Sequence, residues 1–287
     1  MIFTLLVSLC VVFAFANALC SDYSKNQASC LKSSEDGVKC SFCSSAAAGT
    51  TCMKETDAKT LPSSVFQCTY QAGVSQSYNA SVAGAQYGLD FSSAASSSSA
   101  SCFVSNGFTY VVPRGYRSSG AVDTAVCGSL NTAKAAGIAT RDVYLFPQPT
   151  STTKSAATQM SELLNYLKTN CGSAWSGRVW LDIEGSQYWT TSTSSNKAFY
   201  QALVDSCSAN GIRCGVYSSM SQWSSIFGST SYSYGSSLPL WYAHYDNNPS
   251  FSDFSPFAGW TTPHAKQYAG DVTVCSMGVD KNYSPSF

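Results

Sequence analysis

Charged residues are scarce in this chain. They make up 11% of its 287 residues, and 16 Lys and Arg balance 16 Asp and Glu, so the net charge is zero. Without an excess of basic residues the chain lacks the electrostatic feature of nucleic-acid-binding proteins, and we expect no nucleic acid among its partners. Hydrophobic residues still make up 44% of the chain, which is enough for a large folded core.

Histidine is rarer still, with two residues and none before position 244. The segment Cys40-Ser41-Phe42-Cys43 has the CxxC spacing of zinc and redox sites, but no histidine lies near it, and cysteines of a secreted chain usually form disulfides. We therefore interpret these two cysteines as disulfide-forming and predict no metal site and no cofactor. The GxGxxG and P-loop lysine motifs are also absent, which disfavours a nucleotide-binding fold.

The sequence also lacks a long apolar segment beyond its first residues. These residues, MIFTLLVSLCVVFAFANALC, form an apolar run that is short for a bilayer span of roughly 20 apolar residues. Ala16-Asn17-Ala18 fits the small-x-small pattern of a signal-peptide cleavage site. We predict a signal peptide over residues 1–18, no membrane span after its cleavage, and a secreted or phagolysosomal location.

Cysteine is abundant, with 13 residues. Loss of Cys10 with the signal peptide leaves an even number in each part of the chain. The first group is Cys20, Cys30, Cys40, Cys43, Cys52 and Cys68, and the later group is Cys102, Cys127, Cys171, Cys207, Cys214 and Cys275. These numbers predict complete pairing within each group, as expected in an oxidising compartment, and leave the connectivity open.

The distribution of residue types divides the chain. Residues 19–70 are rich in cysteine and lack apolar periodicity, which predicts a small module held together by disulfides. Residues 71–86 are small and polar and are predicted to be a linker, with Asn79 as a glycosylation site in the sequon Asn79-Ala80-Ser81. Residues 87–287 are predicted to form one catalytic domain.

In this last part, strand-like apolar runs alternate with helical patterns. The runs cover residues 87–92, 108–117, 142–149, 178–185, 212–219, 240–246 and 265–270. Apolar residues repeat at helical spacing within 126–133, 160–167 and 199–207, and the serine run at 96–99 is expected to begin a further helix. This alternation predicts an α/β fold with a parallel sheet, either a barrel or an open doubly wound sheet.

Acidic side chains stand at the ends of several runs. Asp182 and Glu184 end the run VWLDIEG, and residues two apart in a strand face the same side, roughly 6.5 Å apart. Asp90 ends the first run, and Asp280 lies beyond the run at 265–270, in the segment GVDKNY. Barrel enzymes have their active sites at these strand ends, and crowded carboxylates supply the general acid of glycosidases. A metal site or an ion pair is the alternative interpretation.

The segments YGLDFS, RGYRSSG, VWLDIEG, GVYSS, PLWYAHYD, KQYAGD and GVDKNY occur in this order over residues 87–283. They resemble the glycoside hydrolase family 25 lysozymes, in particular the branch found in invertebrates and protists. The resemblance implies a modified (β/α) TIM-like barrel, and it does not reach the small N-terminal disulfide-rich module. It further implies an enzyme that cleaves the β-1,4 bond between N-acetylmuramic acid and N-acetylglucosamine in bacterial peptidoglycan. We also expect the protein to be a monomer.

The resemblance also implies roles for single residues. Glu184 matches the proton donor, and Asp182 matches a helper that orients the N-acetyl group of the substrate for attack with net retention. Asp90 and Asp280 match the remaining carboxylates of the cleft. Side chains expected to contact sugars are Tyr144, Tyr217, Trp241, Gln267 and Tyr268, with core packing as the alternative for each ring.

Three other residues are expected to be structural: Arg114 and Arg117 hold loops, and His244 is a satisfied barrel histidine. Two other functions remain open. The first is a lectin-like protein that binds peptidoglycan or chitin without cleaving it. The second is a chitinase-like hydrolase, although the longer DxxDxDxE pattern of chitinases is absent before Glu184.

Overall fold

The computed structural model describes residues 19–35, 38–45, 49–58, 61, 67–69 and 85–287. The chain divides into two compact units, Met1–Tyr78 and Asn79–Phe287. The predicted signal peptide, Asn79 and nearly all of the predicted linker lie outside the described residues. Within the described ranges, no helix combines the length and the apolar character needed to cross a membrane.

The first unit is a small antiparallel sheet with three disulfides. Its strands are β1 (Ser34–Glu35), β2 (Val38–Ser45), β3 (Gly49–Lys54) and β4 (Gln67–Thr69), accompanied by the short helices η1 (Cys20–Tyr23), α1 (Gln27–Cys30) and α2 (Glu55–Ala58). Strand β2 pairs with all three other strands. The disulfides are Cys20–Cys40, Cys30–Cys52 and Cys43–Cys68. The two cysteines of the CxxC segment therefore have different partners. The buried centre of this unit consists mainly of disulfide-bonded cysteines, with Tyr23 and Phe42 packed against them.

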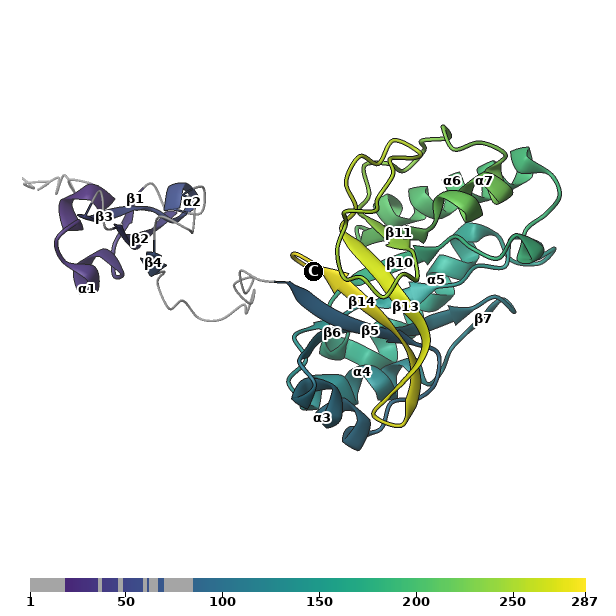
Figure 1. Cartoon of the computed structure of the whole chain (residues 1–287), viewed down its shortest axis with the longest axis horizontal. Helices are drawn as coiled ribbons and strands as arrows, with labels where there is room; N and C mark the ends of the chain where they lie inside the picture. Colours follow the sequence, from purple (N-terminus) through teal and green to yellow (C-terminus); the bar gives the residue numbers. More distant parts are fainter. Residues whose placement is uncertain (1–18, 36–37, 46–48, 59–60, 62–66, 70–84) are drawn as a thin grey trace, which may run out of the picture. The chain divides into compact units, whose positions relative to one another are not determined.

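The second unit is a closed barrel of eight strands (Figure 1). The barrel strands are β5 (Gln86–Phe91), β6 (Phe108–Arg117), β9 (Val143–Leu145), β10 (Arg178–Asp182), β11 (Arg213–Ser218), β12 (Leu240–Ala243), β13 (Ala265–Val274) and β14 (Met277–Ser284). The short strands β7 (Ala121–Val122) and β8 (Thr140–Arg141) pair with β6 outside the ring. The barrel is confirmed, and the open doubly wound alternative is wrong.

One strand runs against the others. Neighbouring strands are parallel from β5 through β6, β9, β10, β11 and β12 to β13, whereas β14 is antiparallel to both β13 and β5. The sequence did not predict this reversal. Its result is that β14 closes the ring beside β5, with Asp280 directly opposite Asp90.

Five α-helices accompany the barrel strands (Figure 1). They are α3 (Ser97–Ser105), α4 (Val126–Ala135), α5 (Ala156–Tyr166), α6 (Thr193–Ala209) and α7 (Met220–Phe227), with the shorter turns η2 (Leu167–Cys171), η3 (Gly172–Ala174) and η4 (Ser186–Tyr188). Serine side chains cap four of the helices by accepting a backbone N–H of the first turn. The predicted helix start in the serine run is confirmed, because Ser96 caps α3.

The core has an outer and an inner part. Between strands and helices, residues such as Leu130, Met160 and Leu203 are fully buried. Inside the barrel, large rings stand beside glycines: Trp180 pairs with Gly215 across β10 and β11, and Tyr110 pairs with Gly88 across β6 and β5. A Cβ atom built on Gly215 would lie 2.3 Å from the Trp180 ring, and one on Gly88 would lie 2.1 Å from the Tyr110 ring. The glycines therefore make room for the rings that fill the barrel.

Three disulfides connect elements of this unit: Cys102–Cys275, Cys127–Cys171 and Cys207–Cys214. The first joins α3 to the tight turn between β13 and β14, in which Cys275 and Ser276 both have positive φ angles, of 54° and 62°. Such angles belong to the two-residue turns that suit β-hairpins. The disulfide thus fixes the hairpin that carries the closing strand.

Candidate active site

A pocket of about 150 Å³ collects four carboxylates at the ends of the barrel strands. Asp90 lies near the end of β5, Asp182 is the last residue of β10, and Glu184 follows two residues later. Asp280 reaches the same pocket from the antiparallel strand β14. The structure therefore brings together the four acidic residues singled out in the sequence.

Burial and mutual repulsion make these carboxyls hard to ionise. Burial is the main cause that raises the pKa of Asp182 well above its ordinary value, and the charges of Glu184 and Asp90 raise it further. Burial also raises the pKa of Glu184, with a further contribution from the charge of Asp280. The pKa of Asp280 is itself raised, again mainly by burial. The pocket therefore retains protons at a pH where separate carboxyls would have lost them.

Gln267 connects two of the carboxylates. Its amide nitrogen donates to both oxygens of Asp90, at 3.1 and 2.9 Å, and to Oδ2 of Asp280 at 3.0 Å. Its amide oxygen accepts the hydroxyls of Tyr217 at 2.5 Å and Tyr245 at 2.9 Å. The side chain is 2% exposed and protein groups occupy its hydrogen-bonding capacity. We therefore correct the expectation of a sugar contact: Gln267 holds Asp90 and Asp280 in place.

Asn282 supports Asp90 from the other side, and the sequence analysis missed it. Its amide nitrogen donates to Oδ2 of Asp90 at 2.6 Å, and its oxygen accepts the indole N–H of Trp241 at 2.8 Å. Burial and the charge of Asp280 raise the pKa of Asp90 well above its ordinary value, although these donors act in the opposite direction. The signal was present in GVDKNY, because Asn282 follows Asp280 by two residues and shares its face.

Asp182 has no comparable support. It is 4% exposed, and its Oδ1 atom is buried without a hydrogen-bond partner among the described residues. Leaving a buried polar atom unpaired costs about 1–3 kcal/mol. The residue Asp182 still lines the pocket, so its carboxyl forms part of the wall beside a bound ligand.

Most of the predicted aromatic contacts line the pocket. Tyr144, Tyr217 and Trp241 do so, and the loop residues Phe146 and Tyr245, which the sequence analysis did not select, join them. Tyr268 is outside the lining. The register of β13 shifts between Gln267 and Ala269, and Tyr268 lies at this irregularity. The expected sugar contact of Tyr268 stays a prediction.

The residues expected to be structural have protein partners. Arg114 and Arg117 both donate to Asp123, at 2.9 and 2.8 Å, and so hold the segment after β6, while Arg114 also lines the carboxylate pocket. His244 lies outside this pocket, and its Nδ1 atom is 2.5 Å from Oδ2 of Asp253.

Only one group of His and acidic side chains in the described ranges is compact enough to hold a metal ion. It consists of His244, Asp246 and Asp253, whose ligand atoms lie within 4.8 Å of one another. The ammonium of Lys266 already binds there, 2.7 Å from Oδ2 of Asp246 and 2.8 Å from Oδ1 of Asp253. Lys266 is 0% exposed, and a buried charge needs such partners. We interpret the group as the ion-pair network of Lys266.

Comparison with known proteins covers the barrel. A family model described as Lysozyme-like protein 1 matches residues 79–268. Probable GH family 25 lysozyme 2 of Dictyostelium discoideum is 48% identical over 198 residues, which cover 69% of this chain and 90% of the relative. Lysozyme-like protein 5 of Caenorhabditis elegans is 39% identical over 205 residues, which cover 71% of this chain and 94% of the relative.

A solved structure agrees in fold. The muramidase from Acremonium alcalophilum superposes with a TM-score of 0.54 at 22% sequence identity, over 69% of this chain and 93% of that one. At this identity the likeness concerns the fold alone. The family model matches more than half of the chain, and both relatives are covered almost completely. The chain therefore belongs to the glycoside hydrolase family 25 lysozymes.

Proposed function

We propose that the protein hydrolyses the β-1,4 bond between N-acetylmuramic acid and N-acetylglucosamine in bacterial peptidoglycan. The observation that carries this proposal is the convergence of Asp90, Asp182, Glu184 and Asp280 in one pocket at the ends of the barrel strands. The name of the similar Dictyostelium discoideum protein, probable GH family 25 lysozyme 2, supports the same substrate.

Glu184 is the proton donor in this proposal. Its raised pKa, caused first by burial and then by the charge of Asp280, favours the protonated carboxyl that can act as an acid. The proton passes to the glycosidic oxygen as the bond between this oxygen and the anomeric carbon breaks. The sugar that leaves thereby receives a neutral hydroxyl group.

Asp182 orients the acetamido group of the sugar whose bond is cleaved. Its carboxyl group, which lines the pocket, accepts the amide N–H and so directs the acetamido oxygen toward the anomeric carbon. That oxygen forms the new bond while the glycosidic bond breaks, and a water molecule deprotonated by Glu184 then opens the ring so formed. Two displacements at one carbon give net retention of configuration.

Asp90 and Asp280 supply negative charge beside the acid. Gln267 and Asn282 fix their positions, and the charge of Asp280 contributes to the raised pKa of Glu184. In this arrangement Asp280 favours the protonated form of Glu184, and both side chains lie where they can stabilise positive charge that develops on the sugar.

We further propose that residues 1–18 direct the chain into the secretory pathway, with residues 19–70 as a separate module, 71–86 as a linker and 87–287 as the catalytic domain. The protein would act outside the cell or in the phagolysosome. The six disulfides support this location, because such bonds persist in oxidising compartments.

Clearing of a peptidoglycan suspension, with identification of the new reducing ends, tests the function. We expect Glu184→Gln to lower the rate by at least about 100-fold while binding and folding persist, because the amide keeps the shape but holds no proton to donate. Glu162→Gln on α5, outside the pocket, is the control and should keep wild-type activity. A wild-type protein that binds peptidoglycan without clearing it would instead support the lectin-like alternative.

A further inference from the structure

Glu184 lies just beyond the end of its strand. Strand β10 ends at Asp182, and the next backbone N–H, that of Ile183, donates to the Tyr217 carbonyl at 2.9 Å. Gly185 then turns the chain with a positive φ angle of 65°, which glycine adopts without strain. The acid therefore stands in a bend, where contacts other than the pairing of strands have to fix its backbone.

The peptide group that follows Glu184 is held at both ends by side chains. Its carbonyl oxygen, which belongs to Glu184, accepts the indole N–H of Trp189 at 3.0 Å. Its N–H, which belongs to Gly185, donates to Oε1 of Gln222 at 2.9 Å. In a trans peptide these two groups point in opposite directions, so the two contacts together fix the orientation of the peptide plane.

The peptide group that precedes Glu184 is held as well. The hydroxyl of Ser218 donates to the carbonyl oxygen of Ile183 at 2.8 Å. Ser218 is the last residue of β11 and is fully buried, which keeps its hydroxyl beside the neighbouring strand. Side chains thus hold the peptide groups on both sides of Glu184, and these two groups determine the direction in which its side chain leaves the backbone.

We propose that these three side chains position the proton donor by fixing the two peptide groups that flank Glu184. This inference rests on the proposed function. Trp189, Gln222 and Ser218 lie outside the lining of the carboxylate pocket. They are positioning residues, because they act on the reaction through the backbone of Glu184.

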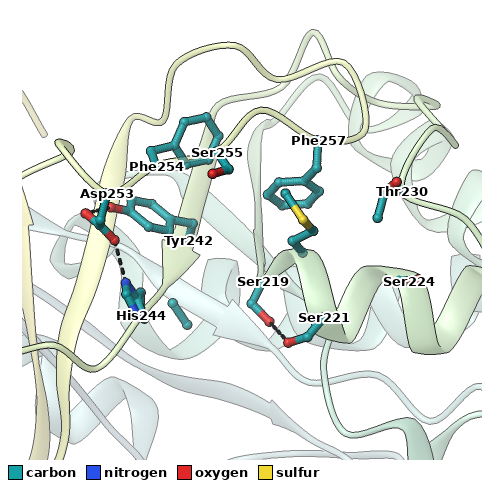
Figure 2. Close-up of a pocket in the computed structure, with 12 residues that line it drawn as sticks. Ser219, Ser221, Ser224, Thr230, Tyr242, His244, Asp253, Phe254, Ser255 and Phe257 are labelled. Carbon is teal, nitrogen blue, oxygen red and sulfur yellow. Dashed lines mark hydrogen bonds and ion pairs between the residues drawn. The ribbon is translucent and has the colours of Figure 1, made fainter.

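Helix α7 places Gln222 for its contact. Ser219 caps this helix by accepting the backbone N–H of Gln222 at 3.2 Å. Figure 2 shows Ser219 at the start of α7, beside a second pocket of about 520 Å³. Gln222 follows the cap by three residues, where the glutamine of a capping box turns back to the cap residue. Here its oxygen binds the bend after β10, so the side chain serves the loop of the acid.

Trp189 has a second role, in packing. Its ring is 5% exposed and meets the rings of Phe199 and Phe227 edge to face, with centroids 6.1 and 5.7 Å away. A substitution of Trp189 would therefore disturb the core as well as one hydrogen bond. Gln222 is only half-buried, so a change there isolates the contact with the peptide group.

Substitution of Gln222 tests the proposal. Gln222→Met keeps the length of the side chain but removes the acceptor, and we expect it to lower kcat/KM on peptidoglycan strands about tenfold, since small displacements of a reacting group cost large factors in rate. Gln222→Glu restores an acceptor oxygen and should recover most of this loss at its own pH optimum. Ser225→Met, at an exposed position of the same helix, is the matched control and should equal wild type. Circular dichroism should show all three variants folded.

Two further measurements distinguish positioning from a merely structural role. If Gln222 acts through Glu184, Gln222→Met should cost nothing more in the Glu184→Gln variant, whereas independent effects would multiply. A nitrophenyl glycoside of the same sugar has a leaving group that departs without a proton. On that substrate, we expect kcat/KM of Gln222→Met to lie within about twofold of wild type.

An unchanged kcat/KM of Gln222→Met on peptidoglycan strands would overturn the proposal. So would the full loss in the double variant, or an equal loss on the nitrophenyl glycoside, because Gln222 would then act elsewhere than on the acid.

Hydrogen exchange gives a measurement that does not depend on turnover. The Gly185 amide should exchange about tenfold faster in Gln222→Met than in wild type, since its N–H loses its acceptor. Equal exchange in the two proteins would also overturn the proposal. Failure of the proposed function differs, since wild type would then not cleave peptidoglycan while the exchange at Gly185 still reports the contact.

Discussion

Asp182 has a buried carboxyl group, and its raised pKa means that ionisation of this group disfavours the folded state. A carboxyl with a raised pKa binds its proton more tightly in the folded protein than in the unfolded chain. Its contribution to stability is fully present below the unfolded pKa, about 4, and is lost as the pH rises through the folded pKa. Burial first, and then neighbouring charges, raise the pKa of Asp90, Asp182 and Glu184 in this way.

We therefore expect the free energy of unfolding to fall as the pH rises from about 4 toward neutrality. Asp182→Asn should flatten this dependence and raise the stability at neutral pH by about 1 kcal/mol or more, because no buried charge then forms. The same change should lower hydrolysis strongly. Urea unfolding over a pH series measures the stability, with the exposed Asp205→Asn as the control. A stability that rises with pH in the wild type and is unaffected by Asp182→Asn would contradict the expectation.

Sequence patterns predicted the four acidic residues but not all of their neighbours. The acids stand at the ends of apolar runs, which a reader of the sequence can locate. Strand alternation does not decide the direction of Tyr268, because the register of β13 shifts between Gln267 and Ala269. Gln267 donates hydrogen bonds to Asp90 and Asp280, which are distant from it in the sequence. A local sequence pattern therefore could not predict that Gln267 binds these carboxylates.

At the scale of elements, the barrel depends on pairs of a ring and a glycine on neighbouring strands. Trp180 on β10 and Tyr110 on β6 are both fully buried, and the Trp180 ring lies 5.6 Å from the Trp241 ring, between centroids. With little space to move, Trp180 cannot yield to a larger residue at Gly215. The positions of Gly88 and Gly215 are thus fixed by packing.

We expect Gly215→Ala to lower the free energy of unfolding by about 2 kcal/mol, because the added methyl overlaps the Trp180 ring. Gly128→Ala is the opposite case. It lies inside α4 with no atom within 4 Å of the added Cβ, so it should raise stability by about 0.5–1 kcal/mol. Thermal or urea unfolding of both variants measures the difference, and equal effects would show that the ring has room to shift.

The sequence predicted where most strands and helices lie, but it did not predict that β14 runs antiparallel to its neighbours. The run at 108–117 coincides with β6, and the helical spacings fall in α4, α5 and α6. Helix α7 was missed, since its apolar residues span barely two turns. The reversal of β14 has no local signature either, because an alternating strand is the same in both directions and only its neighbours decide the pairing.

For the whole molecule, the pairing of cysteines predicts that the two units are independent. Three disulfides lie within residues 20–68 and three within 102–275, and none joins the two sets. We expect deletion of residues 20–80 to leave a folded enzyme that cleaves soluble peptidoglycan fragments at a rate within about twofold of wild type, since independent domains separate without loss of their cores. A folded but inactive truncated protein would show that the first unit contributes to the site.

The strand that closes the barrel, β14, is the last strand to be synthesised, so the barrel can be completed only at the end of synthesis. Strand β5 is synthesised early, but it pairs with β14. The hydrogen bond from Asn282 to Asp90 therefore joins residues that are 192 positions apart. Contacts between such distant residues are slow to form, and chains fold from the N-terminal side as they emerge. Until β14 arrives, the nascent barrel has open edges, and its acidic pocket lacks one wall. We therefore expect the active site to form only when β14 closes the sheet, and the disulfide between Cys102 and Cys275 joins α3 to the hairpin that carries this strand.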